Sequence, residues 1–228
     1  GQDWTLGTGW SIGDDKAICD GTQTSTSYCQ QIIPISTGDS VKLSIDVTVD
    51  SGTFTILDGN SGTIVLSETV SGTYTVYFTW SGSNSNLFLR APIGFVGSVT
   101  NISVKEVGQN WNLGSGATVG DDKAIISGDG SVAGSIEQTS VFSSGKTYKI
   151  TLDAVINSGG GLNVKHGIAY ADNIGSIITT GSYTFYYTAS STKSLVITRK
   201  TGGVAYDSSV TNISVKEVGQ NWTLQNGW

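Results

Sequence analysis

One long segment occurs twice in this chain. Residues 99–111 recur without a change as residues 210–222, and the opening Gly1-Gln-Asp-Trp4 resembles the Gly-Gln-Asn-Trp ends of both segments. The duplication predicts one repeat over residues 1–107, a second over 108–218, and the start of a truncated third over 219–228. These repeats are far longer than solenoid units, so each is expected to bury a hydrophobic core of its own.

Alternation of apolar and polar residues is the main local pattern. In the first repeat Val41, Leu43, Ile45, Val47 and Val49 share one face, and in the second Tyr148, Ile150, Leu152 and Ala154 do so. Such period-two runs predict half-buried strands. Further strands are expected at 52–57, 62–68, 72–80, 86–90 and 97–107, and at 161–169, 175–179, 181–188 and 193–199. No segment has a helical period, so we predict an all-β chain of two tandem β-sandwich domains with essentially no helix.

Composition excludes several classes of function. The chain has 31 Gly and 2 Pro, which suits short strands joined by tight turns, and its formal net charge is -6. Its basic residues are dispersed, so no positive stripe for nucleic acid is visible. No apolar run is long enough to insert into a membrane, and no signal-like segment opens the sequence.

The two cysteines, Cys19 and Cys29, occur where the second repeat has Ile126 and Ile136. Residues 16–19 and 27–32 flank a polar loop and are interpreted as a hairpin, in which the cysteines would be direct cross-strand partners. That closeness predicts a disulfide and hence an oxidising setting. The alternative is two free thiols that pack as small hydrophobic groups.

Four segments of the first repeat resemble a known group of domains. The opening Trp4 and Trp10, the segment Ile12-Gly-Asp-Asp-Lys-Ala17, and the closing residues 99–107 are similar to jelly-roll carbohydrate-binding modules of families four and nine. Residues 72–80 resemble the strand before the final hairpin of these modules. Carbohydrate-binding modules of this kind recur in bacteriophage tail and virion proteins. The resemblance implies a jelly-roll fold, sugar binding without catalysis, and an extracellular or virion-surface location.

Aromatic residues that differ between the repeats are the first candidate ligand contacts. Trp10 corresponds to Ala117, and Trp80 to Ala189. A core position rarely exchanges Trp for Ala without compensation, so both indoles are predicted to be exposed and available to stack on a sugar. The alternative is that they pack in the core or contact a neighbouring domain. Trp4 and Trp111 recur with Trp222 and are expected to be structural.

Polar and aromatic side chains near strand ends complete the candidate set. Arg90 and Arg199 could clamp the carboxylate of an acidic sugar, or they could simply be solvated residues at strand ends. Tyr170 and Tyr187 could contact the ligand in the second repeat. His166, the one histidine, lacks a partner for a zinc site and is expected to be an exposed strand residue.

The repeated acidic pairs Asp14-Asp15 and Asp121-Asp122 are candidate metal ligands. Clustered carboxylates in a loop suit calcium, and the resembled modules often hold a structural calcium ion. Turn chemistry alone also explains a Gly-Asp-Asp sequence.

The sequence favours a non-catalytic repeat of a surface fibre or virion appendage. It would attach to host glycans by weak multivalent contacts, and its partners would be glycans together with further copies of the chain or other virion proteins. Two alternatives are a purely structural filament or decoration subunit, and the accessory binding region of a secreted polysaccharide-degrading enzyme.

Overall fold

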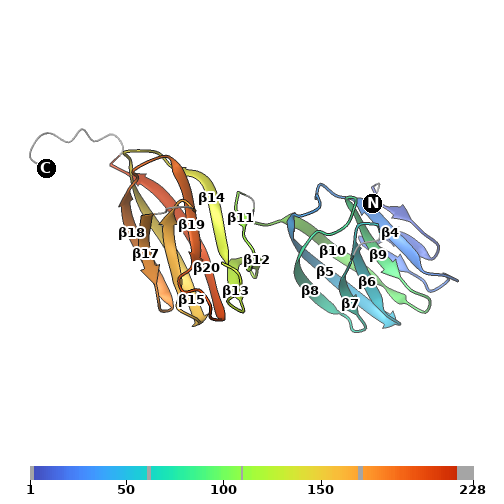
Figure 1. Cartoon of the computed structure of the whole chain (residues 1–228). Helices are drawn as coiled ribbons and strands as arrows, with labels where there is room; N and C mark the ends of the chain where they lie inside the picture. Colours follow the sequence, from blue (N-terminus) through green and yellow to red (C-terminus); the bar gives the residue numbers. More distant parts are fainter. Residues whose placement is uncertain (1–2, 61–62, 109, 169–171, 220–228) are drawn as a thin grey trace, which may run out of the picture. The chain divides into compact units, whose positions relative to one another are not determined.

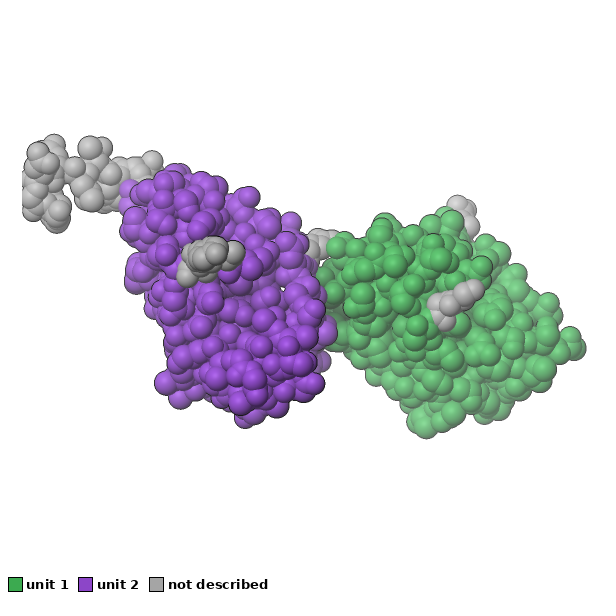
Figure 2. Space-filling view, viewed as in Figure 1, with its two compact units in different colours: residues 1–107 green, residues 108–228 purple. Residues whose placement is uncertain are grey.

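The computed structural model describes residues 3–60, 63–108, 110–168 and 172–219 (Figure 1). The chain divides into two compact units, residues 1–107 and 108–228, which we call unit 1 and unit 2 (Figure 2). Of the predicted third repeat, only Gly219 lies within the described residues.

In the described part of unit 1, the secondary structure consists of strands. These are β1 (Thr5–Leu6), β2 (Trp10–Gly13), β3 (Lys16–Cys19), β4 (Ser27–Ile32), β5 (Ser40–Ser51), β6 (Phe54–Asp58), β7 (Ile64–Glu68), β8 (Gly72–Thr79), β9 (Asn86–Ala91) and β10 (Val96–Glu106). They form two antiparallel sheets with the strand orders β1-β4-β9-β6-β7 and β2-β3-β10-β5-β8.

Unit 2 repeats this arrangement. Its strands are β11 (Asn112–Leu113), β12 (Ala117–Gly120), β13 (Lys123–Gly128), β14 (Ser135–Phe142), β15 (Thr147–Ser158), β16 (Leu162–His166), β17 (Asp172–Ile177), β18 (Gly181–Thr188), β19 (Lys193–Arg199) and β20 (Tyr206–Val218). Their orders are β11-β14-β19-β16-β17 and β12-β13-β20-β15-β18.

The connectivity is that of a jelly roll. From β3 to β10 the chain alternates between the two sheets, except at the β6–β7 hairpin. Two short strands, β1 and β2, extend the sheets at one side. This agrees with the predicted fold class, and the described residues contain no helix, hence none that could span a membrane.

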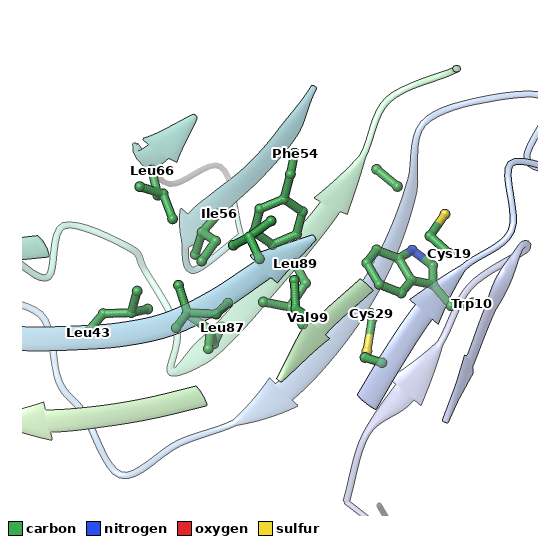
Figure 3. Close-up of a cluster of buried hydrophobic side chains, with 14 of the residues drawn as sticks. Trp10, Cys19, Cys29, Leu43, Phe54, Ile56, Leu66, Leu87, Leu89 and Val99 are labelled. Atoms are coloured by element: carbon green, nitrogen blue, oxygen red, sulfur yellow. The ribbon is translucent and has the colours of Figure 1, made fainter. Parts of the chain in front are cut away.

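The inward faces of the strands form one core in each unit. Val41, Leu43, Ile45 and Val47 of β5 are buried, as are their counterparts on β15, so the predicted faces of these strands are confirmed. Figure 3 shows part of the unit 1 core, where Phe54, Ile56 and Leu66 from one sheet approach Leu43 and Val99 from the other.

Both cysteines lie in the unit 1 core, but the predicted hairpin between their strands is wrong. Cys19 on β3 pairs with Trp10 and Gly97, whereas Cys29 on β4 belongs to the opposite sheet and pairs with Leu89. Both are free thiols with no exposed surface, so the disulfide is not formed. In Figure 3 the thiols appear on either side of the Trp10 indole. The residues between the two strands cross from one sheet to the other instead of turning back.

Trp10 and Trp80 are also core residues, which contradicts their predicted exposure. Trp10 is 7% exposed and Trp80 is 1% exposed. Trp10 packs beside Phe95 with ring centroids 6.4 Å apart, and the Trp80 indole N–H donates to the Asn84 carbonyl at 2.9 Å.

Larger neighbours explain how unit 2 can have alanine at these two positions. Tyr206 replaces Phe95 near Ala117, and its hydroxyl bonds the Gly134 amide and the Val132 carbonyl. Near Ala189, unit 2 has Phe142 and Tyr148 where unit 1 has Ile35 and Val41. The exchange of Trp for Ala is therefore compensated inside the core and does not mark a surface site.

Candidate functional site

One hollow of unit 1 lies at the β2–β3 hairpin. We call it the hairpin groove. Its volume is about 550 Å³, within the range of sites for small ligands. It is lined by Trp4, Ile12, Gly13, Asp14, Asp15, Lys16, Ala17, Gln31, Ile33, Pro34, Leu87, Val99, Thr100, Asn101, Ile102 and Val104.

A tight turn positions the acidic pair Asp14-Asp15. Gly13 pairs with Lys16, so Asp14 and Asp15 form a two-residue hairpin loop, and their φ angles are 51° and 59°. Two positive φ angles are typical of a type I′ turn, which Asp tolerates. Both carboxylates are exposed beside the groove.

A bulge in β10 places an amide beside this turn. The register between β10 and β5 shifts between Thr100 and Ser103, and Asn101 has a φ of 52°. Its side-chain amide donates to Asp46 at 2.6 Å, while the Thr100 hydroxyl donates to the Asp15 carbonyl at 2.9 Å. Hydrogen bonds from Thr73 and then Asn101 hold the pKa of Asp46 below its usual value.

The remaining wall is apolar. The Trp4 indole is half-buried and packs against the core together with Ile33, Ile102 and Val104. The groove therefore combines an aromatic and aliphatic wall with a rim of carboxylate, amide and ammonium groups. That combination is suited to a ligand that has both C–H faces and hydroxyl groups.

Unit 2 keeps the same residues almost throughout. Strand register equates Leu87 with Leu195, because each pairs with a glutamine, Gln31 or Gln138. Across the whole lining, the replacements are Val119 for Ile12, Ser140 for Ile33 and Val141 for Pro34.

The turn and bulge of unit 2 also share their geometry with those of unit 1. Asp121 and Asp122 have φ angles of 50° and 57°, and Asn212, with a φ of 53°, donates to Asp153 at 2.7 Å.

The residues predicted as ligand contacts do not form one site. Arg90 lies on β9 opposite Tyr28, whereas the Arg199 guanidinium donates to the Gly130 carbonyl at 2.7 Å and lies over the Tyr206 ring. Arg199 thus holds a loop. Trp10 and Trp80 are in the core, and Tyr170 lies outside the described residues.

Tyr187 belongs to a cluster around His166. The His166 side chain is fully buried, so the prediction that His166 is exposed is wrong. Tyr187 donates to Asp172 at 2.8 Å, and its ring lies 5.2 Å from the imidazole. Ser190 also donates to Asp172, and these two bonds lower the pKa of that carboxyl.

The His166 cluster does not have the geometry of a catalytic triad. His166 Nε2 lies 2.8 Å from the Ser191 carbonyl, and Nδ1 lies 3.5 Å from Asp172. The Ser190 hydroxyl is bonded to the carboxylate, whereas acyl transfer needs a hydroxyl bonded to an accessible imidazole.

Calcium binding at the acidic pairs stays a prediction. In the part of the chain that the structure describes, no three His, Cys, Asp or Glu side chains converge as metal ligands. The type I′ turn by itself accounts for the Gly-Asp-Asp sequence.

Sequence reasoning missed Lys16, Gln31, Asn101 and Ile102 as groove residues. The identical segments, residues 99–111 and 210–222, were the available signal, because they contain the bulge. The register that brings the bulge to the hairpin turn depends on the tertiary pairing of β3 and β10.

Comparisons with known proteins assign neither a family nor a ligand to this chain. No protein-family model matches the chain, and no curated protein matches it. Among solved structures, the tandem CBM22-1–CBM22-2 domain of Xyn10C from Paenibacillus barcinonensis is 12% identical, with a TM-score of 0.34, and the match covers 95% of this chain and 94% of that one. Procruciferin, an 11S globulin from Brassica napus, is 6% identical, with a TM-score of 0.17 and coverage of 94% and 86%. At these identities and TM-scores the similarities carry no argument about function.

Proposed function

We propose that the chain is a non-catalytic carbohydrate-binding repeat whose glycan site in each unit is the hairpin groove. One observation carries this proposal: the groove residues recur in unit 2 while the core residues around them differ. An indole and aliphatic wall would contact the C–H face of a pyranose, and Asp15, Lys16 and Asn101 would bond its hydroxyls.

Two weak sites on one chain support attachment by avidity. Linking sites raises overall affinity without any new contact, provided that both sites can be occupied at once. We propose that this chain is displayed at a cell or virion surface, as in a phage tail fibre, where many copies would contact host glycans. Other copies of the chain or virion proteins would be its structural partners.

The test is a glycan array probed with a multimerised form of the chain. The test variant carries Asp14→Asn, Asp15→Asn, Asp121→Asn and Asp122→Asn, because Asn tolerates the same positive φ and the turns are kept. Asp50→Asn, an exposed residue on β5 outside the groove, is the control. We expect array signals to fall about tenfold or more in the test variant and to persist in the control.

Other outcomes would support one of the alternative functions or overturn the assignment of the groove. Absence of any glycan signal at high valency would support a structural filament or decoration subunit. Glycan signals that survive all four substitutions would overturn the groove assignment. A polysaccharide-degrading domain elsewhere in the parent polypeptide would make this chain an accessory binding region.

A further inference from the structure

The outer face of the sheet β2-β3-β10-β5-β8 carries a row of basic and aromatic side chains. Lys42 on β5 is the direct cross-strand partner of Tyr77 on β8 and of Lys105 on β10. The Lys42 ammonium lies 5.3 Å from the centroid of the Tyr77 ring. Neighbouring strands are about 5 Å apart, so the row extends roughly 10 Å across the sheet.

Unit 2 has the same row at the same register. Lys149 on β15 is the partner of Tyr186 on β18 and of Lys216 on β20. Tyr186 is 64% exposed, which is a large apolar surface to leave in water. We call Tyr77–Lys42–Lys105 and Tyr186–Lys149–Lys216 the basic rows.

The strands that carry the basic rows differ between the two units on their inward faces. Val41, Val76 and Trp80 of unit 1 correspond to Tyr148, Phe185 and Ala189 of unit 2, and these positions point into the cores. The outward positions nearest the rows keep their chemistry. Ser44 and Thr75 of unit 1 correspond to Thr151 and Thr184 of unit 2, and beyond them Asp46 corresponds to Asp153. Surface substitutions usually change stability by about 0.5 kcal/mol or less, so folding alone does not explain an outer face that is retained better than the core.

The row of unit 2 is also unfavourable for the isolated sheet. Like charges directly opposite each other on neighbouring strands are destabilising, and Lys149 lies directly opposite Lys216. An anionic partner would remove this repulsion, although the formal net charge of the whole chain is -6.

We propose that the basic rows are a second binding surface, for acidic polysaccharides whose sugars carry carboxylate or sulfate groups. The tyrosine ring packs against the C–H face of one sugar, and the two ammonium groups pair with anions along the polymer. These contacts are separate from the hairpin groove, so the two surfaces can be tested independently.

The experiment measures binding of the whole chain to immobilised polygalacturonate, with neutral dextran as the reference polymer. We compare K149Q/K216Q, and the same changes combined with K42Q/K105Q, with K165Q/K200Q as a control of equal charge change to the first. We expect the four-lysine variant to bind about tenfold more weakly or worse, the two-lysine variant to be intermediate, and the control to match the wild type. Binding should also weaken as salt is raised, because the charges are at the surface.

Tyr186→Ala provides a second variant whose fold is not in question, because the ring is exposed. It should weaken binding to polygalacturonate without changing the salt dependence. Equal losses in the control and row variants would overturn the proposal in favour of non-specific charge attraction. Equal binding of the wild type to dextran and polygalacturonate would also overturn it, as would row substitutions that alter only self-association in sedimentation.

The four-aspartate groove variant separates the two proposals. It should keep polygalacturonate binding, whereas the row variants should keep the array signals of the groove. A row variant that also loses the array signals, or a groove variant that also loses polygalacturonate binding, would show that the two surfaces are not separate sites.

Discussion

Asp58 of unit 1 and His166 of unit 2 occupy the same position in the two jelly rolls. Each ends its strand opposite a buried leucine, Leu87 or Leu195, and neither has any exposed surface. Asp58 accepts hydrogen bonds from the backbone amides of Thr63 and Ser81, and so ties the β6–β7 loop to the segment after β8. His166 bonds the Ser191 carbonyl in the segment after β18. The fold needs a bridging polar group here, and the two units supply it with different chemistry.

Removing the Asp58 bridge should destabilise unit 1 alone. Asp58→Ala leaves buried backbone amides without an acceptor, and we expect a loss of about 3 kcal/mol. Hydrogen exchange read by mass spectrometry reports the units separately, and faster exchange should appear in β6 to β8 while β16 to β18 stay protected. Equal acceleration in both units would contradict this account.

Unit 2 should lose stability in acid partly through Asp172. Hydrogen bonds from Tyr187 and Ser190 lower the pKa of this carboxyl in the folded state, so its contribution is complete above the unfolded pKa of about 4. It should be lost as the pH falls below that value towards the folded pKa. The melting temperature of Asp172→Asn should therefore lie below that of the wild type at pH 6 and approach it at pH 2. A constant difference across this range would refute the linkage.

Trp80 should be a stability residue. Trp80→Ala removes a side chain that is 1% exposed, and we expect about 3–5 kcal/mol of destabilisation. The reciprocal Ala189→Trp should also destabilise, because Phe142 and Tyr148 already fill that part of the unit 2 core. Urea unfolding followed by tryptophan fluorescence measures both changes. A neutral Trp80→Ala would restore the surface interpretation of this indole.

The cysteines should behave as buried thiols. Burial raises the pKa of both, that of Cys29 to about 12, so little thiolate exists at neutral pH. We expect no reaction with a disulfide reagent at pH 8 until the chain is unfolded in denaturant, and then reaction at both sites. A reductant should leave the melting temperature unchanged. A lower melting temperature in reductant would show that a disulfide forms after all.

The β10 bulge should need a residue that accepts a left-handed conformation. In Asn101→Ala, the positive φ should lower the free energy of unfolding by about 1–2 kcal/mol, and the hydrogen bond to Asp46 is lost as well. Asn101→Gly should lose only the hydrogen bond, because glycine accepts a positive φ. Chemical denaturation should therefore rank the wild type above the glycine variant and the glycine variant above the alanine variant. Asn212 offers the same comparison in unit 2. The reverse order of the two variants would exclude backbone strain as the cause.

The local sequence pattern was sufficient to predict the fold class and the inward faces of the long strands. Alternation identified the inward faces of β5 and β15, and the absence of a helical period identified an all-β fold, because period-two order is a property of the strand itself. The copied segment also contains Asn101, whose bulge shapes the groove, but the sequence does not reveal that role.

Only the tertiary structure decided which strands are neighbours. Cys19 and Cys29 are close in sequence and belong to opposite sheets. Trp10 and Trp80 are buried in the unit 1 core, and larger neighbouring side chains accompany the alanines at these positions in unit 2. Alternation says which residues share a face, but it does not say which sheet a strand joins or which neighbours fill its core. Those choices depend on packing between segments distant in the chain, and the same packing brings the Asp14-Asp15 turn beside the Asn101 bulge.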